Sequence, residues 1–320
     1  MNYILFLEAF QDKYKDIKDN QLLFQYLREE LQYLILYTLY AKMRYPVYFM
    51  GGTKLRLSYK INRFSEDIDL ALDKADLNFP SEKFFSDITK EFSEKITGFQ
   101  LHSKLSTNRN VIKIMLSFGQ ILFDLGISPL QSQAIKIKIE LDINPPDNAK
   151  YEKKTYRSSA GDYLISTYDL STGFAGKLAA VLFREYQKGR DYYDLQWYLQ
   201  HKPTIYPNLD YLNANSLQQH EKSFENVSEV LIAVTKKVKK LDLALMRKDL
   251  ERFVVMDFAT FENWLKNYIP ETLILLQDYQ NSYENGGANP IQRQNIWHGG
   301  AGKLFQRTCD HNQNTAFASV

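Results

Sequence analysis

Two glycines followed closely by a pair of aspartates constrain the fold more than any other part of this 320-residue chain. Gly51 and Gly52 allow a backbone turn that a Cβ atom would obstruct, and the residues after Thr53 have the pattern of a short helix. Asp67 and Asp69 follow on a segment of alternating side chains, so they share one face of a strand, roughly 6 to 7 Å apart. The segment therefore predicts a turn, a helix and a strand in close succession.

Both halves of this segment suit a polyphosphate and its cation. Gly51 and Gly52 bring backbone N–H groups close to phosphate oxygens, and Thr53 can cap the helix that follows. Two carboxylates on one strand face can share Mg²⁺ or Mn²⁺, which neutralises a triphosphate and lowers the pKa of an attacking hydroxyl. Either sequence alone is usually a turn or a solvated strand face. Their coupling favours a nucleotide site.

A second acidic strand is predicted over residues 135–146, where the chain alternates with a period of two. One face is apolar, and the other carries four charged side chains: Lys136, Lys138, Glu140 and Asp142. That face can simply meet water, or it can bring a further carboxylate to the aspartate pair. Glu140 and Asp142 are both candidates because they lie on the same side, with one of the lysines balancing the charge.

Residues 168–199 read as two helices broken at Gly189. Asp169 or Ser171 can cap the first of them. Four charged side chains recur at spacings that place them along one side of the first helix or near the start of the second: Lys177, Arg184, Asp191 and Asp194. Spacing alone leaves two interpretations, an ordinary exposed face or one wall of a binding cleft.

The stretch GGTKLRLSYKINRFSEDIDLAL resembles the first motif of the AbiEii/AbiGii toxin family, in the polymerase-β-like nucleotidyl transferase superfamily. The acidic strand, and the pattern Gly-Lys-x6-Arg followed by Lys-Gly-Arg-Asp-x2-Asp, are similar to two later motifs of that family. The resemblance covers residues 45–200 well and extends loosely to 280. It implies an α/β (α+β) fold, in which a nucleotidyl transferase core with a mixed sheet precedes a mainly helical C-terminal domain.

The resemblance also implies roles for individual residues. The metal ligands and catalytic carboxylates are expected among Asp67, Asp69, Glu140 and Asp142. Nucleotide phosphates are expected to lie against Gly51, Gly52 and Thr53. Lys177 would bind phosphate from the helical half, while Asp191 would orient it or assist the chemistry. Arg184 and Asp194 are expected as further substrate contacts.

The activity implied is transfer of a nucleoside monophosphate from a nucleoside triphosphate to an acceptor, with release of pyrophosphate. Similar proteins imply a tRNA 3′ end as acceptor, and the toxin of a bacterial toxin–antitoxin or phage-defence pair, neutralised by an antitoxin from a neighbouring gene. Two other classes stay open: transfer of AMP to a partner protein, and a non-catalytic nucleotide- or RNA-binding module. Three mutually repelling acids argue against the module, which has no need of them.

An acidic site cannot attract RNA, so basic side chains around it would have to do so. Four basic residues lie between the two halves of the first motif: Lys54, Arg56, Lys60 and Arg63. They are either displayed beside the cleft or part of an ordinary solvated turn. A second basic run, at residues 236–240, is expected to be the solvated face of a helix.

Composition narrows the class further. The formal charge of +2 excludes a uniformly basic surface for nucleic acid. The single cysteine, Cys309, excludes an intrachain disulfide and suits a reducing cytoplasm. The N-terminus lacks a basic n-region, so no signal peptide is expected. Residues 31–41 are apolar but too short to span a bilayer, which predicts a buried helix and no membrane partner.

Four segments are expected along the chain. A helical N-terminal segment covers residues 1–45, an α/β core 46–151, a helical domain that completes the cleft 152–280, and a poorly ordered tail 281–320. Within the helical domain, residues 206–214 read as a loop, and 227–240 and 261–268 read as helices.

Overall fold

Seven strands form one mixed sheet at the centre of the computed structural model, which describes residues 1–42, 45–108, 110–201, 205–219, 221, 223–254 and 262–263. The order across the sheet is β3-β4-β5-β2-β1-β7-β6, with β2 parallel to β5 and β1 parallel to β7. The strands are β1 (Val47–Met50), β2 (Ile68–Leu72), β3 (Gln100–Asn108), β4 (Val111–Gly119), β5 (Ile135–Asp142), β6 (Tyr151–Ser158) and β7 (Gly161–Tyr168). The predicted mixed α/β fold is therefore confirmed.

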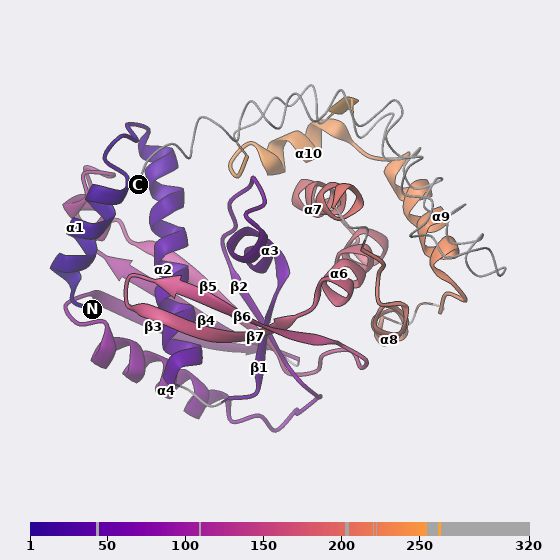
Figure 1. The fold of residues 1–320 in the computed structure, drawn as a ribbon, viewed down its shortest axis with the longest axis horizontal. Coiled ribbons are helices and arrows are strands. Elements are labelled where there is room, and N and C mark those ends of the chain that lie inside the picture. Colours follow the sequence, from indigo (N-terminus) through magenta and orange to yellow (C-terminus); the bar gives the residue numbers. More distant parts are fainter. Residues whose placement is uncertain are drawn as a thin grey trace.

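Helices of the N-terminal half pack on the sheet, and those of the C-terminal half lie to one side of it (Figure 1). Those of the N-terminal half are α1 (Tyr3–Lys13), α2 (Asn20–Lys42), α3 (Gly51–Tyr59), α4 (Ser81–Lys95) and α5 (Ile121–Asp124). Those of the C-terminal half are α6 (Leu170–Phe183), α7 (Gly189–Gln200), α8 (Leu209–Gln218), α9 (Val227–Val238) and α10 (Leu243–Leu250). No helix among the described segments has the length and apolar character needed to cross a membrane.

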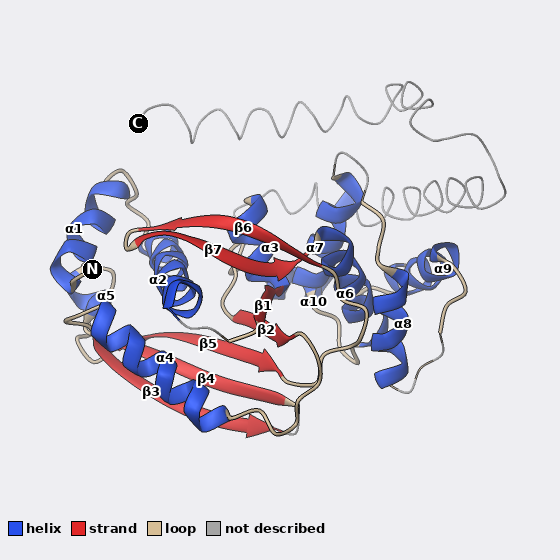
Figure 2. Cartoon of the chain, turned by 60° about the horizontal axis from the view of Figure 1, so that its bottom comes forward, coloured by secondary structure: helices blue, strands red, loops and turns tan. Residues whose placement is uncertain are grey.

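Two hydrophobic cores stand on the two sides of the central strands. In the first, α2 crosses the twisted sheet against β5, β6 and β7, and α4 packs beside it (Figure 2). The apolar stretch at 31–41 forms the largely buried C-terminal half of α2, as predicted. In the second core, α3 and the end of β7 meet the helices α6 to α10. The aspartates lie at the start of β2, the middle strand of the sheet, whose apolar side chains contribute to both cores.

Several local predictions differ from the structure. The sheet continues through β6 and β7 to Tyr168, beyond residue 151 where the α/β core was expected to end. The loop expected at 206–214 is wrong, because Asn208 accepts a hydrogen bond from the N–H of Tyr211 and so caps α8. Asparagine favours both turns and helix starts, so the pattern was ambiguous. Residues 264–268 and the tail 281–320 lie outside the described residues.

The break between the two predicted helices is longer than one residue. Helix α6 ends at Phe183, and α7 begins at Gly189, so Arg184 to Lys188 form the connection. Asp169 is the N-cap of α6, and its carboxylate accepts a hydrogen bond from the N–H of Thr172 at 2.7 Å. The helix expected at 227–240 is confirmed as α9.

Candidate active site

Strand pairing places three carboxylates together. Asp69 lies on β2 opposite Glu140 of the parallel strand β5, and Asp67 comes directly before β2 begins. On the other side, Asp69 pairs with Met50, the last residue of β1, after which α3 starts. The two halves of the first motif therefore meet at one point of the sheet, as their coupling in the sequence suggested.

The glycines allow the N-terminus of α3 to approach Asp69. Gly51 has a φ of +78°, and a Cβ atom there would lie 2.1 Å from Oδ2 of Asp69. A Cβ atom on Gly52 would lie 2.4 Å from the guanidinium of Arg63. No larger residue fits at either position without displacing a charged group. The free N–H groups of this helix start are thus next to the carboxylates, an arrangement that suits a bound anion with its cation.

Thr53 has a different role from the one expected. It lies inside the first turn of α3, whose N-cap is Met50, and its hydroxyl donates to the backbone carbonyl of Asp67. Its side chain is fully buried. Thr53 therefore ties the helix to the carboxylate loop and does not cap the helix. Ser65, which the sequence analysis missed, has its hydroxyl 3.3 Å from where a Cβ atom on Gly52 would lie.

Asp69 is the least neutralised of the three carboxylates. Burial, and then the charges of Asp67 and Glu140, raise its pKa to about 6. Within the described part of the chain, no side chain or backbone group donates a hydrogen bond to the carboxylate of Asp69, and no cation forms an ion pair with it. Asp67 and Glu140 instead share Lys138, whose Nζ lies 3.1 Å from Asp67 and 3.0 Å from Glu140.

Of the two candidates on β5, only Glu140 belongs to this carboxylate cluster of Asp67, Asp69 and Glu140. Asp142 lies one pleat further along, opposite Ala71, and accepts a hydrogen bond from the N–H of Asn144 at 2.9 Å. Burial raises the pKa of Asp142, without a cation beside it. Glu140 differs: despite burial, Lys138 and Lys113 hold its pKa below the ordinary value. The strand register, which decides between the two, could not be derived from the sequence.

The chemistry of the cluster fits a hard divalent cation. No group of three or more His, Cys, Asp and Glu side chains in the described ranges is gathered closely enough to hold a metal by itself. Mg²⁺, however, is commonly bound by one or two carboxylates together with water and substrate phosphates. Asp67 and Asp69 supply two, and the unpaired carboxylate of Asp69 is the observation that favours a cation here.

The helical half presents a second charged group, the paired cluster, built on α6, α7 and the segment before β2. Lys177 lies 3.0 Å from Asp191 and 2.8 Å from Asp194. Arg63 donates two hydrogen bonds of 2.6 Å to Asp194, and Arg184 bonds to Asp191. Every carboxylate of this cluster has two cationic partners. The residues that the late motif singled out are thus brought together.

Burial and pairing act oppositely on the groups of the paired cluster. Burial would lower the pKa of Lys177, but the carboxylates of Asp194 and Asp191 raise it. Burial would raise the pKa of Asp194, yet Arg63 and Lys177 hold it below the ordinary value. Asp194 has no exposed surface. It therefore acts as an internal counter-ion to Arg63 and Lys177, and the substrate contact expected of it stays a prediction.

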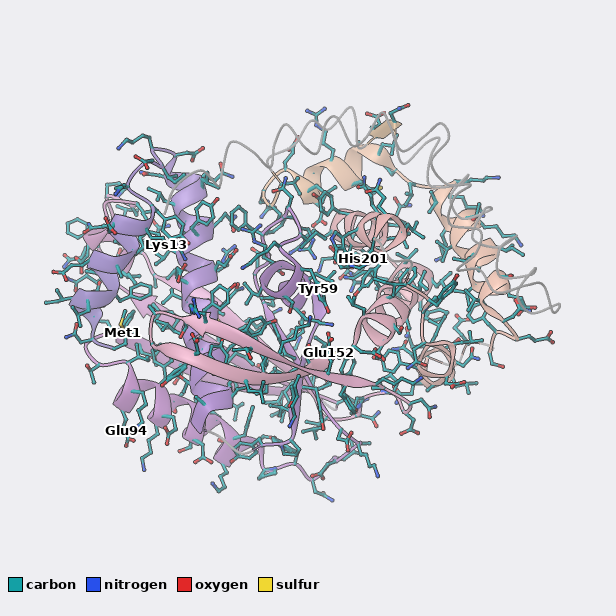
Figure 3. The ribbon with its side chains drawn as sticks, viewed as in Figure 1. Met1, Lys13, Tyr59, Glu94, Glu152 and His201 are labelled. Carbon is teal, nitrogen blue, oxygen red and sulfur yellow. The ribbon has the colours of Figure 1, made fainter. Side chains whose placement is uncertain are left out.

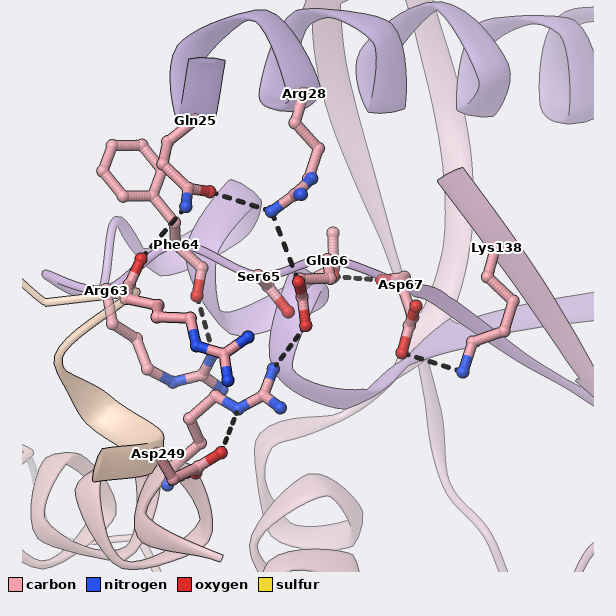
Figure 4. Close-up of polar contacts among 12 residues, drawn as sticks. Gln25, Arg28, Arg63, Phe64, Ser65, Glu66, Asp67, Lys138 and Asp249 are labelled. Carbon is pink, nitrogen blue, oxygen red and sulfur yellow. Dashed lines mark hydrogen bonds and ion pairs between the residues drawn. The ribbon is translucent and has the colours of Figure 1, made fainter. Parts of the chain in front are cut away.

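A further ion network that the sequence analysis missed holds the loop before β2 (Figure 4). Glu66 pairs with Arg28 of α2 at 3.6 Å and with Arg190 of α7 at 3.3 Å. Arg190 also pairs with Asp249 of α10 at 3.5 Å. Ion pairs from both halves of the molecule therefore hold Glu66, the residue next to Asp67, in place. Such partners are distant in the sequence, so no local pattern indicates them.

The proposed RNA-contacting display of Lys54, Arg56, Lys60 and Arg63 is wrong for most of its members. Lys54 and Arg63 are buried, and Arg56 is paired with Glu29 at 2.6 Å. Lys54 bonds to the carbonyl of Tyr168 and lies 3.5 Å from Glu152, which itself accepts a hydrogen bond from Tyr59 (Figure 3). Burial lowers the pKa of Lys54 to about 8. These cations stabilise the folded protein by pairing with acidic side chains, and they are therefore not available to an RNA phosphate.

Comparison with known proteins agrees with this geometry. Residues 35–267 match the family described as "Nucleotidyl transferase AbiEii toxin, Type IV TA system". JHP933 from Helicobacter pylori is 18% identical, with 82% of this chain and 95% of that chain covered and a TM-score of 0.50. A putative nucleotidyltransferase from H. pylori is 19% identical, covers 80% and 96%, and has a TM-score of 0.49.

An antigenic nucleotidyltransferase-like protein from Paracoccidioides brasiliensis is 15% identical, covers 76% and 97%, and has a TM-score of 0.34. No curated protein matches the sequence. The structural likeness to JHP933 supports the fold alone. The family match spans well over half of the chain and includes both charged clusters, and so the protein belongs to the AbiEii family of nucleotidyl transferase toxins of type IV toxin–antitoxin systems.

Proposed function

We propose that this protein is a metal-dependent nucleotidyl transferase that moves a nucleoside monophosphate from a nucleoside triphosphate to RNA, with a tRNA 3′ end as the acceptor. The observation that carries the proposal is the carboxylate of Asp69. It has no partner among the described residues, lies between Asp67 and Glu140, and meets the N-terminus of α3. A metal-bound triphosphate supplies both a cation for such a carboxylate and a phosphate for such a helix N-terminus.

In this proposal Asp67 and Asp69 would hold Mg²⁺ or Mn²⁺. The bound ion would neutralise the triphosphate and lower the pKa of the acceptor hydroxyl. The N–H groups of Gly51 and Gly52, at the start of α3, would donate to phosphate oxygens. Glu140 stays beside the metal-binding pair and can take the acceptor proton once Lys138 turns away from it.

The helical half would hold the nucleotide from the opposite side. Burial, Asp67 and Glu140 raise the pKa of Asp69, and the charges of Lys177 and Lys188 act in the opposite direction. Lys177 is therefore positioned to contact a phosphate that bridges the two halves. Asp191 orients Lys177 and Arg184 by accepting from both, while Asp194 fixes Lys177 from within. In-line transfer depends mostly on such positioning and charge neutralisation.

The cellular role follows from the family. A type IV toxin has a cognate antitoxin, which we place in a neighbouring gene, and growth arrest through modified tRNA would serve abortive infection by phage. Expression of the protein alone should then stop bacterial growth, and the Asp67→Ala form at equal abundance should not.

Radiolabelled nucleoside triphosphates incubated with total RNA and with lysate protein test the proposal. We expect label in the tRNA fraction, dependent on Mg²⁺ or Mn²⁺ and absent with Asp69→Asn. Label in protein alone would replace the RNA acceptor by a partner protein. Label in neither, with nucleotide still bound, would leave a binding module and overturn the proposed transfer.

A further inference from the structure

A hollow of about 450 Å³ opens between the α6–α7 connection and helix α9. Its described lining includes five cations: Arg184, Lys188, Lys236, Lys237 and Lys240. Two acids, Glu185 and Asp191, also line it. Asp191 is already neutralised by Lys177 and Arg184. The hollow therefore carries a net positive charge although the whole chain has a formal charge of only +2.

Most of these cations lack a counter-ion. The ammonium groups of Lys188, Lys236, Lys237 and Lys240 form no ion pair or hydrogen bond with any residue that the structure describes. The three lysines of the α9 end are exposed, and Lys188 is half-buried. Burial and the neighbouring charge of Arg190 lower the pKa of Lys188. Like charges gathered without partners repel one another, and an external polyanion relieves that repulsion.

The hollow has a fixed shape. The side chain of Gln187 donates to the carbonyl of Lys240 at 3.2 Å and accepts from the N–H of Asp242 at 2.7 Å. The start of α7 is close to α10, since a Cβ atom on Gly189 would lie 2.5 Å from the carbonyl oxygen of Met246. Helix α9 packs along α6. The connection and the lysines of α9 thus form two walls held at a constant separation.

The hollow is continuous with the candidate active site. Arg184 and Asp191 belong both to its lining and to the paired cluster. The paired cluster in turn reaches the start of α3, since a Cβ atom on Gly52 would lie 2.4 Å from the guanidinium of Arg63. A chain of cations therefore leads from the exposed lysines of α9 to the carboxylates. A polymer of phosphates can follow such a path, whereas a single triphosphate spans only its inner end.

An aromatic ring stands at the rim. Tyr186 is 65% exposed, and the guanidinium of Arg184 lies over its ring at 5.3 Å from the centroid. A basic groove beside an exposed aromatic side chain is the usual combination for single-stranded nucleic acid, because bases stack on the ring while cations follow the backbone.

We propose that this hollow binds the sugar–phosphate backbone of the single-stranded end of the acceptor RNA and guides that end to the carboxylates. The proposal rests on the proposed function and deepens it by placing the acceptor. It also assigns the RNA contacts to residues of the α6–α7 connection and the end of α9. The basic residues of the first motif are largely buried or paired.

Binding of a short fluorescein-labelled single-stranded RNA, followed by anisotropy at several salt concentrations, tests this placement. The full chain carries Asp69→Asn in all samples, so that no transfer occurs during the titration. The test variant adds Lys236→Gln, Lys237→Gln and Lys240→Gln. The matched control adds Lys74→Gln, Lys95→Gln and Lys104→Gln, three exposed lysines elsewhere on the surface. Both variants lose the same charge, and thermal melting checks that both are folded.

We expect the test variant to bind RNA at least about tenfold more weakly at 0.1 M salt, with a log–log salt slope shallower by about 2, since each phosphate contact contributes roughly 0.7 for single strands. Tyr186→Ala should weaken binding by about tenfold with little change of slope. The control should behave as the parent does. A separate titration with a non-hydrolysable triphosphate uses the parent, the test variant and the control with Asp69 restored, and these three proteins should bind it with equal affinity.

Equal RNA binding by the test variant and the control would overturn the placement. So would a loss of triphosphate affinity with RNA affinity intact, because the hollow would then hold the nucleotide. Since the titration needs no catalysis, RNA binding that depends on these lysines would stand even if the labelling experiment found no transfer. The two failures are therefore distinguishable.

Discussion

The two groups of carboxylates, the carboxylate cluster and the paired cluster, differ in their counter-ions. In the paired cluster, Asp191 and Asp194 each have two cationic partners, and Asp194 is fully buried. In the carboxylate cluster, Asp67 and Glu140 share Lys138, and Asp69 has no described partner. The difference teaches that pairing with cations, and not acidity or burial, distinguishes the two groups, and the proposed metal ion belongs to the group that contains the unpaired Asp69.

The largest expected effect concerns Asp69. Asp69→Asn should reduce nucleotide transfer to background, because it removes a carboxylate that no other described group replaces. The same change should leave thermal stability unchanged or slightly higher, since it relieves repulsion with Asp67 and Glu140. Transfer assays and thermal melts of one preparation measure both. Normal turnover, or a large loss of stability, would remove the distinction between the clusters.

The opposite result is expected for Asp194. Asp194→Asn leaves the buried guanidinium of Arg63 without its charged partner, which should destabilise the protein by about 3 to 5 kcal/mol. Chemical denaturation measures the loss. The double change Arg63→Met with Asp194→Leu should recover part of it, because an apolar pair leaves no buried charge uncompensated. A single variant as stable as the wild type would mean that the pairing contributes nothing.

Lys177 belongs to the paired cluster, and the proposed function also gives it a contact with a nucleotide phosphate, so its substitution should affect both binding and stability. Lys177→Ala should weaken nucleotide binding by about tenfold or more, equivalent to one charge-assisted contact of roughly 1.5 to 3 kcal/mol. Nucleotide titration of the folded variant, below its melting temperature, checks this. If only stability falls while affinity stays constant, Lys177 is an internal counter-ion like Asp194.

The smallest effect concerns Lys54, a buried cation outside both clusters. Burial lowers its pKa in the folded state to about 8, from an ordinary value of 10.5. Between these values the unfolded chain holds the proton and the folded chain does not, so stability rises with pH. Relative to Lys54→Met, the wild type should gain about 2 kcal/mol from pH 8 to pH 10. A difference that is constant over this range would contradict the lowered pKa.

The sequence predicted the elements of the site better than their partners. The turn, helix and strand of the first motif, the alternating strand and the two late helices follow from local patterns, and each is present. The choice of Glu140 over Asp142 depends on how β5 aligns with β2, which no local pattern specifies.

The same limit explains the basic residues. Lys54 and Arg63 resemble solvated residues in the sequence, yet their partners Glu152 and Asp194 come from distant positions. Conversely, the lysines near the end of α9 follow an amphipathic pattern that predicts only a solvated face, and their nearness to Lys188 emerges from packing between helices. The surroundings of both groups of cations thus depend on long-range packing, which local sequence patterns do not specify.

Binding of Mn²⁺, measured by electron paramagnetic resonance with a non-hydrolysable triphosphate present, tests the central claim most directly. The wild type should bind the ion, and Asp69→Asn should bind it at least about tenfold more weakly. Asp142→Asn, on the same strand but outside the cluster, should bind as the wild type does. Lys138→Met should bind more tightly, because its ammonium competes for Asp67 and Glu140. Equal affinity of the wild type and Asp69→Asn would contradict the account.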